Sequence, residues 1–225
     1  MDLERRTALL AQTELFEGID AATQLRIAGA IDERVVERGE TLFIQDEPGD
    51  RMFILAEGAV KLYVTSRHGG VVELVRHHPP ATFGELALLD GGRRSASAEA
   101  VERSTVLVVT RQELLNLLRS EERVAGALLR SLGAIVRRTT RQVTDLVFLN
   151  LQGRLATRLL DLAVDGRDGP RTRPVTQTEL ASMIGGTRQT VNQVLRSFES
   201  RGIIRISGRC VEILDRKRLE HFAEQ

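Results

Sequence analysis

One helical stretch, residues 120–148, constrains the fold of this chain more than any other feature. Its apolar and small residues recur at alternating spacings of four and three, the a/d pattern of a two-stranded coiled coil. This seam consists of Ala125, Leu129, Leu132, Val136, Thr139, Val143 and Leu146. The stretch has no proline, so about 28 residues rising 1.5 Å each give a rod of about 42 Å. The pattern predicts a dimerisation helix that pairs with a second copy of the chain.

The ends and interior of this helix leave an alternative open. Ser120 precedes two acidic residues and is a candidate N-cap. Gly126 and Gly133 each weaken the helix by about 1 kcal/mol relative to alanine. The competing interpretation is therefore a buried helix within one globular domain.

Length and charge indicate two domains around the rod. The chain has 225 residues, enough for two separate cores. Residues 150–225 carry 13 Arg and Lys against 9 Asp and Glu, whereas residues 1–149 carry 19 against 22. The positive excess indicates that the C-terminal part binds a polyanion such as nucleic acid.

Cysteine content and hydropathy narrow the class of protein. Cys210 is the single cysteine, which excludes an intramolecular disulfide and any multi-cysteine zinc or iron–sulfur site. No apolar run approaches 18 residues, and the first ten residues are polar and of mixed charge. We expect a soluble cytoplasmic protein that does not associate with membranes.

The N-terminal half predicts two short helices followed by an antiparallel β-structure. Residues 3–12 and 21–30 have amphipathic helical patterns. Short strands separated by glycine-containing turns follow, at residues 34–37, 41–44, 51–56, 59–66, 71–77, 95–101 and 105–110. This pattern predicts an antiparallel β-barrel or jelly roll, and hence an α+β protein.

A loop between two of these strands has the residues of a phosphate site. Residues 83–89 predict a short helical turn, and a glycine-rich segment, 90–96, follows it. A glycine before a helix start frees backbone N–H groups for an anion, and Arg94 beside Ser95 can bind phosphate oxygens. Glu85 could accept a hydrogen bond from a sugar hydroxyl. An ordinary glycine-rich hairpin loop with a surface arginine is the alternative.

The C-terminal third predicts a winged helix-turn-helix. Residues 151–164 are amphipathic and end in a polar loop at 165–170. Thr176 and Glu179 form a capping box for a helix that ends at Ile184, and Thr187 caps a second helix reaching about Ser200. The apolar residues that face inward on this second helix are Val191, Val194, Leu195 and Phe198.

The second helix leaves a polar face exposed near its N-terminus, the position from which such helices read a DNA groove. This face comprises Arg188, Gln189, Asn192 and Gln193. Residues 203–206 and 210–214 predict a hairpin that forms the wing. Cys210 lies on a wing strand, where a packing role is favoured over a redox role.

Taken together, the barrel, the Gly84 to Ser95 loop, the rod and the winged helix-turn-helix resemble the CRP/FNR superfamily of bacterial transcription regulators. The resemblance covers nearly the whole chain. It implies an effector-sensing domain at 1–119, a dimerisation helix and hinge at 120–149, and a DNA-binding domain at 150–225. It also implies a homodimer that binds a double-stranded operator with inverted repeats and contacts RNA polymerase.

The resemblance assigns effector contacts residue by residue. By resemblance to the cyclic-AMP receptors of this superfamily, Gly84 and Glu85 of this chain would contact the ribose. Arg94 and Ser95 would contact the cyclic phosphate. Thr139 and Thr140 match a pair of hydroxyl residues that meet adenine, one from each subunit, which favours cyclic AMP. The complete predicted effector site is Gly84, Glu85, Leu86, Arg94, Ser95, Thr139 and Thr140. The loop is one residue shorter than in the cyclic-AMP receptor, so another effector, or a vestigial barrel without one, stays an alternative.

The resemblance also assigns DNA contacts. These are Thr176, Thr187, Arg188, Gln189, Thr190, Asn192, Gln193 and Arg209. Gln189 stands where cyclic-AMP receptors have glutamate, and Gln193 where they have arginine. Glutamine pairs best with adenine, so we expect an altered half-site that retains the guanine read by Arg188.

Other classes of function fit the sequence less well. The iron–sulfur branch of the superfamily needs an N-terminal cysteine cluster, which this chain lacks. His77 and His78 are adjacent on a predicted strand and would point to opposite faces, so they cannot both ligate one haem iron. The residues after the rod contain no catalytic triad, metal-ligand or P-loop pattern. We therefore expect no metal, no haem and no enzymatic activity; a cyclic-nucleotide-regulated enzyme is the weakest alternative.

Overall fold

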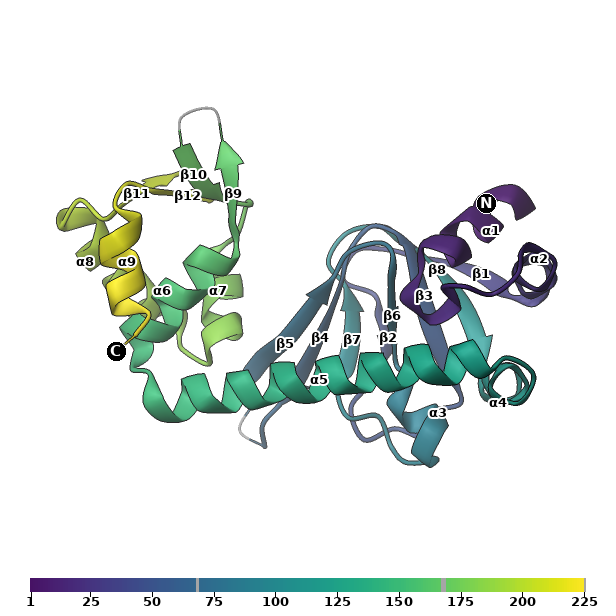
Figure 1. Cartoon of the computed structure of the whole chain (residues 1–225). Helices are drawn as coiled ribbons and strands as arrows, with labels where there is room; N and C mark the ends of the chain where they lie inside the picture. Colours follow the sequence, from purple (N-terminus) through teal and green to yellow (C-terminus); the bar gives the residue numbers. More distant parts are fainter. Residues whose placement is uncertain (68, 167–168, 225) are drawn as a thin grey trace. The chain divides into compact units, whose positions relative to one another are not determined.

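A computed structural model describes residues 1–67, 69–166 and 169–224 of the chain (Figure 1). It contains two compact units, residues 1–136 and 137–225, and the helix α5 (Glu122–Phe148) has residues in both. In the described ranges, no helix is long and apolar enough to cross a membrane.

Two four-stranded antiparallel sheets build the first unit. One sheet has the order β1-β8-β3-β6, with β1 (Asp32–Val36), β8 (Ser104–Thr110), β3 (Arg51–Glu57) and β6 (Ala81–Phe83). The other has the order β2-β7-β4-β5, with β2 (Thr41–Phe43), β7 (Ser97–Ala100), β4 (Val60–Thr65) and β5 (Val71–His77). The predicted antiparallel α+β fold is confirmed, as two separate sheets rather than one closed barrel.

The sequence prediction missed one strand of these sheets. β6 has only three residues, too few for an alternating pattern to show, and it follows Pro79-Pro80. It forms because Phe83 lies opposite Phe53 on β3, where both rings are buried. The helical turn predicted at 83–89 forms as α3 (Leu86–Asp90), later than predicted because Phe83 belongs to β6.

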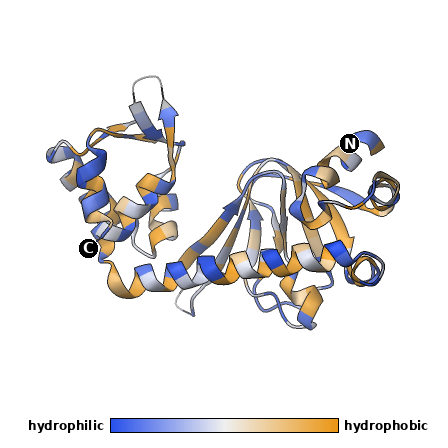
Figure 2. Cartoon of the chain, viewed as in Figure 1, coloured by the Kyte–Doolittle hydropathy of each residue, from blue (hydrophilic) through white to orange (hydrophobic). Residues whose placement is uncertain are grey.

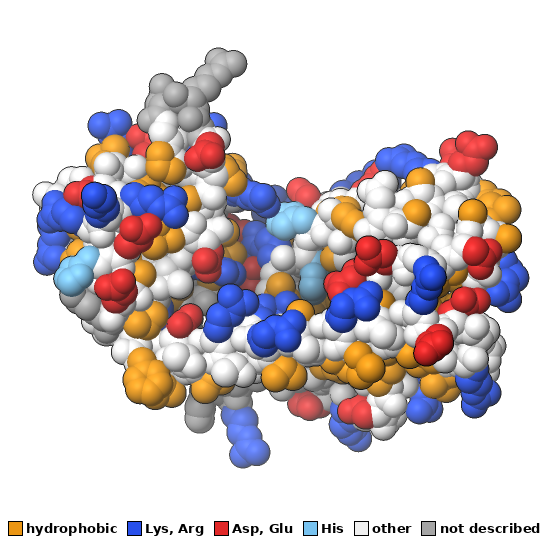
Figure 3. All heavy atoms as spheres, viewed as in Figure 1, with side chains coloured by type: hydrophobic (Ala, Val, Ile, Leu, Met, Phe, Trp, Pro, Cys, Tyr) orange, Lys and Arg blue, Asp and Glu red, His pale blue; other side chains and the backbone are white. Residues whose placement is uncertain are grey.

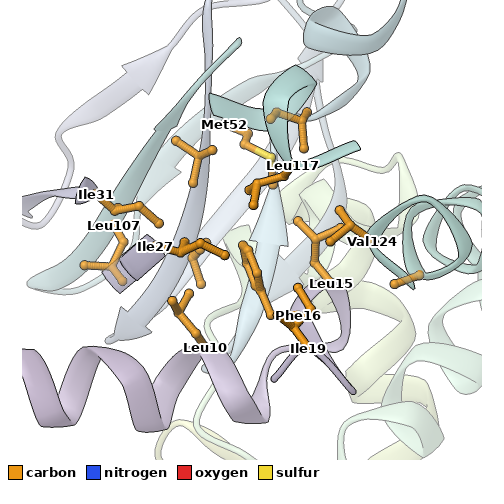
Figure 4. Packing of buried hydrophobic residues seen from close by; sticks show 14 of the residues in the cluster. Leu10, Leu15, Phe16, Ile19, Ile27, Ile31, Met52, Leu107, Leu117 and Val124 are labelled. Carbon is orange, nitrogen blue, oxygen red and sulfur yellow. The ribbon is translucent and has the colours of Figure 1, made fainter. Parts of the chain in front are cut away.

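The predicted N-terminal helices are confirmed as α1 (Leu3–Gln12) and α2 (Ala21–Ala30), which flank a short 3₁₀ turn, Glu14–Phe16. Asp2 and Asp20 cap them by accepting from backbone N–H groups. Their apolar faces join β3, β8 and the first turns of α5 in one buried cluster, where Phe16, Ile27 and Val124 point toward one another (Figure 4).

The predicted start of the rod is wrong. Ser120 is the last residue of a separate helix, α4 (Arg111–Ser120), which Thr110 and Glu113 begin with a capping box. The helix is interrupted at Glu121, whose N–H donates to the Leu117 carbonyl, and α5 begins at Glu122. The reason is burial, because Leu114 and Leu117 draw α4 into the core while the seam pattern belongs to α5 alone.

The second unit has the predicted winged helix-turn-helix. Its elements are α6 (Leu151–Asp161), β9 (Ala163–Gly166), β10 (Gly169–Thr172), α7 (Gln177–Ile184), α8 (Arg188–Ser200), β11 (Ile204–Ser207), β12 (Cys210–Ile213) and α9 (Arg216–Phe222). The wing hairpin extends into a sheet of order β11-β12-β10-β9. The prediction of a polar loop at 165–170 is wrong, because its described residues belong to β9 and β10. Residues 167 and 168 lie outside the described residues.

Candidate effector site and DNA interface

The loop from Gly84 to Arg94 folds back on itself in the first unit. Gly84 has φ +85° and Gly91, which ends α3, has φ +70°, the left-handed region that favours glycine. Arg94 is only 4% exposed, which disagrees with the alternative of an ordinary hairpin loop with a surface arginine.

Backbone carbonyls hold the guanidinium of Arg94. Its Nη1 donates to the Gly84 carbonyl at 2.8 Å, and its Nη2 donates to the Arg51 carbonyl at 2.7 Å. The guanidinium carbon lies 4.1 Å from the centre of the Phe43 ring, a cation–π contact. Its Nε is buried without a hydrogen-bond partner in the described part of the chain.

Burial sets the electrostatics of Arg94. Removal from water lowers the pKa of Arg94 below its ordinary value, and the charges of Asp50, Glu47 and Glu85 act in the opposite direction. Among the described residues no carboxylate lies within ion-pair distance of the guanidinium. A buried cation whose hydrogen-bond acceptors are neutral carbonyls is costly, and an anion bound beside it would offset that cost.

Two glycines make room for this arrangement. A Cβ on Gly84 would lie 2.9 Å from Arg94 Nη1, and a Cβ on Gly49 would lie 3.0 Å from the Arg94 guanidinium and 2.4 Å from Ala87. Any side chain at either position would therefore displace the guanidinium or the loop.

Aromatic rings next to Arg94 were not predicted from the sequence. Phe43 stacks on Phe53 with ring centres 5.8 Å apart, Phe53 stacks on Phe83 at 5.4 Å, and His77 stacks on Phe83 at 5.7 Å. These residues come from four different strands, so no local sequence pattern could have grouped them. His77 thus contacts the apolar cluster through Phe83.

The remaining predicted effector residues differ in exposure. Glu85 is buried, Gly84 and Leu86 are partly buried, and Ser95 is exposed next to Arg94. Thr139 and Thr140 are exposed on α5. The structure brings Gly84 and Arg94 into direct contact, and the roles of the other residues stay predictions.

The predicted seam on α5 is mostly exposed in the single chain. Leu129, Val136, Val143 and Leu146 are between 54 and 70% exposed, while Leu132 and Ala125 are partly exposed. Apolar residues recur along α5 in Figure 2, and a broken row of apolar side chains follows its lower edge in Figure 3. Val147 and Phe148, outside the predicted seam, are also exposed. An adjoining face of α5 contributes to the core, where Val124, Ala127 and Leu128 are buried.

Local hydrogen bonds fix the start of the recognition helix α8. Thr187 and Thr190 form a reciprocal capping box, and in α7 Thr176 and Glu179 do the same. Val191, Val194, Leu195 and Phe198 are buried as predicted. The three threonines predicted to bind DNA therefore have their hydroxyls in caps, which places Arg188 and Gln189 in the first exposed turn of α8.

A hollow of about 510 Å³ lies between α7, α8 and the wing. Of the predicted DNA-contact residues, Thr176, Arg188, Asn192 and Arg209 line it. Sequence reasoning missed Gln177, Thr178 and Cys210, which also line it. The missed signal was the position of Gln177 and Thr178 directly after the Thr176 cap, where backbone N–H groups are free.

The other predicted contacts lie outside this lining. Gln189 and Gln193 are exposed on the same helix. Arg209, which does line the hollow, is 60% exposed and lies 3.8 Å from Glu179, a surface ion pair that contributes about 1 kcal/mol at most. Lys and Arg side chains are also scattered over the surface of the second unit, among acidic and apolar ones (Figure 3). Within the described ranges, no three His, Cys, Asp or Glu side chains come together in a group that could hold a metal ion.

Comparison with known families matches both units. Residues 33–121 match the cyclic nucleotide-binding domain family, and residues 153–222 match the Crp-like helix-turn-helix domain family. A Mycobacterium tuberculosis "CRP-like cAMP-activated global transcriptional regulator" is 33% identical over 96% of this chain and 98% of its own length. A Thermus thermophilus "Cyclic AMP receptor protein" is 33% identical over 93% of this chain and 96% of its own length.

Solved structures agree with this assignment. The c-di-GMP responsive regulator CLP of Xanthomonas campestris superposes with a TM-score of 0.78 over 86% of this chain and 99% of its own; at 20% identity it supports the fold alone. The catabolite activator protein of Thermus thermophilus is 30% identical, with a TM-score of 0.56 over 93% of this chain and 98% of its own. The chain belongs to the CRP/FNR family of effector-responsive, DNA-binding transcription regulators.

Proposed function

We propose that the effector of this regulator is cyclic AMP, bound at the loop that carries Arg94. The observation that supports it best is the buried guanidinium of Arg94, which donates to the neutral carbonyls of Gly84 and Arg51 and whose Nε has no partner among the described residues. In this proposal Arg94 and Ser95 hold the cyclic phosphate, Gly84 and Glu85 hold the ribose, and Leu86 lines the same loop. Thr139 and Thr140 meet the adenine.

Isothermal titration tests the effector directly. Cyclic AMP is titrated into the wild type, with cyclic GMP and cyclic di-GMP in parallel. Arg94→Leu should lose about 1.5 to 3 kcal/mol of binding free energy, because it removes a charge-assisted hydrogen-bond pair. Arg38→Leu is the matched control, since Arg38 is exposed and makes no hydrogen bond or ion pair with a described residue. Equal cyclic-AMP affinity in Arg94→Leu and the wild type would reject the assignment.

The protein is further proposed to act as a homodimer through α5. Burying one large apolar seam residue contributes about 1.5 to 3 kcal/mol, and the exposed seam offers several. Leu132→Asp combined with Val136→Asp should give monomers in sedimentation. The control is Ala134→Asp combined with Arg141→Asp, two exposed α5 positions outside the seam. A wild type that sediments as a 25.0 kDa species at micromolar concentration would contradict the dimer.

A dimer with two recognition helices is proposed to bind an inverted repeat. Its half-sites should lie about 34 Å apart, one helical turn of DNA. Selection of bound DNA from random sequence, with and without cyclic AMP, tests this. If the same DNA is selected with equal affinity in both conditions and cyclic AMP leaves thermal melting unchanged, the sensor domain is vestigial or takes another effector.

The family resemblance adds the remaining parts of the proposal. The dimer would contact RNA polymerase, work in the cytoplasm away from membranes, and require no catalytic activity, metal or haem. Transcription with purified RNA polymerase, with and without the regulator and cyclic AMP, measures the first of these.

A further inference from the structure

Arg111, the first residue of α4, makes hydrogen bonds to the Gly84–Arg94 loop and to a turn beside it. Its N–H donates to the Asp50 carbonyl at 2.9 Å, next to the turn that contains Gly49. Its Nε donates to the Leu88 carbonyl of α3 at 3.0 Å. One side chain and one backbone group thus reach two segments that surround Arg94.

The Arg111 guanidinium lies close to two residues at the end of α3, Leu88 and Gly91. Leu88 lies in the last turn of α3, where carbonyls lack partners within the helix, so a guanidinium there supplies a donor. Gly91 ends the same helix, and a Cβ added to it would lie 3.3 Å from Arg111 Nη2. The Arg111 side chain is exposed as a whole, and its guanidinium lies against the C-terminal end of α3.

A continuous buried cluster leads from α3 through α4 into α5. Leu88 of α3, Leu114 and Leu117 of α4, and Val124 of α5 all belong to it. Only Glu121 separates α4 from α5, and its carbonyl accepts from the N–H of Val124. A shift of α3 would thus reach the start of the proposed dimerisation helix through packed residues.

We propose that Arg111 is the positioning residue that transmits effector occupancy from the Gly84–Arg94 loop to α4 and α5. An effector that binds Gly84 and Arg94 restrains α3, and the Arg111 contact with Leu88 passes that restraint to the first turn of α4. The proposal rests on the proposed function, because it assigns the coupling and not the effector contact to Arg111.

The test measures coupling separately from binding in the full-length chain. The coupling ratio is the affinity for selected DNA at saturating cyclic AMP divided by the affinity without it, and linkage requires the same ratio when cyclic AMP is titrated with and without DNA. In Arg111→Met we expect the coupling ratio to fall by about tenfold, whether DNA or cyclic AMP is the titrated ligand. Cyclic-AMP affinity without DNA should stay within about threefold of the wild type.

Two further variants guard against a purely structural explanation. Arg119→Met is the control, because Arg119 is exposed on the same helix as Arg111 is, but makes no hydrogen bond or ion pair with a described residue. Arg111→Lys retains a donor for the Leu88 carbonyl and should recover part of the ratio; it decides the question if Arg111→Met does not fold.

The outcomes separate this inference from the proposed function. A wild-type ratio in both Arg111 variants overturns the inference alone. A loss of cyclic-AMP affinity that matches a loss of thermal stability, with the ratio intact, also overturns it, since Arg111 would then be structural. A wild type that neither binds nor responds to cyclic AMP overturns the proposed function, and this inference with it.

Discussion

Arg94 and Arg188 carry the same guanidinium in opposite settings. Arg94 is buried against Phe43 and held by the carbonyls of Gly84 and Arg51. Arg188 is exposed in the first turn of α8, beside the hollow under the wing. A buried cation depends on a bound anion for neutralisation, so binding of that anion can change the stability of the fold around the cation. An exposed cation is already solvated and can exchange water for DNA without reorganising the domain.

The largest expected effect comes from replacing the fork of Arg94 while keeping its charge. Arg94→Lys has one nitrogen in place of the guanidinium fork, so it cannot hold two carbonyls and a phosphate in the same geometry. Cyclic-AMP affinity at pH 7 should fall by about 1.5 to 3 kcal/mol, measured by titration calorimetry.

The pH dependence of this variant sharpens the comparison. Burial lowers the pKa of an ammonium, so the substituted side chain should lose its proton as pH rises and recover its charge as pH falls. Affinity should therefore increase on lowering pH from 9 to 7 in Arg94→Lys and stay nearly constant in the wild type, whose guanidinium keeps its proton. Parallel pH profiles in the two proteins would show that the site is open to water.

The next largest effect is expected at Arg188. Arg188→Ala should cost about 1 to 3 kcal/mol in binding to the selected DNA and weaken the preference for guanine at one position of each half-site. Because the side chain is exposed, thermal unfolding should change by less than about 0.5 kcal/mol. DNA selection combined with calorimetry measures both quantities. A large loss of stability with DNA preference intact would break the contrast with Arg94.

A smaller effect is expected at Gln189, which is exposed one residue further along α8. Gln189→Glu should shift the preferred base pair away from A·T and toward one that presents a cytosine N4 donor, by about 1 kcal/mol. The readout is the selected DNA motif of the variant beside that of the wild type. An unchanged motif means that Gln189 is a solvated helix residue that reads no base.

The smallest effect is expected at the wing. Arg209→Ala removes a side chain that is mostly exposed and only loosely paired with Glu179. It should weaken all DNA sequences alike and reduce the slope of log affinity against log salt by about 0.9. Binding curves at several salt concentrations measure the slope. A change confined to one DNA sequence would instead show that Arg209 reads a base.

Local signals in the sequence predicted much of the second unit. The capping boxes of α7 and α8 lie within four residues of each helix start, so their hydrogen bonds could be foreseen from spacing alone. The periodicity of α1 and α2 likewise gave their bounds. The predictions that failed depended on residues distant in the sequence. β6 pairs with β3, and Leu117 of α4 is buried in a cluster with Phe16 and Ile27 from the N-terminal segment.

The candidate site shows the same limit. Arg94 could be singled out from its loop, yet its burial could not, because its neighbours Phe43 and Arg51 lie more than 40 residues away. The position of Arg111 against α3 depends on a similar long-range contact with Leu88. Sequence reasoning named the chemistry of the loop, and tertiary packing decides how that chemistry is presented.

The separation of the α5 seam from the reading turn of α8 has a genetic consequence. A chain damaged only at Arg188 keeps the exposed residues Leu129, Val136, Val143 and Leu146, and so keeps the seam proposed for pairing. In a cell that makes both forms, such chains would pair with intact ones. Each mixed dimer would then have only one intact recognition helix and could read only one half-site of the operator. Alleles of this kind should act dominantly, whereas alleles that disrupt the seam should be recessive.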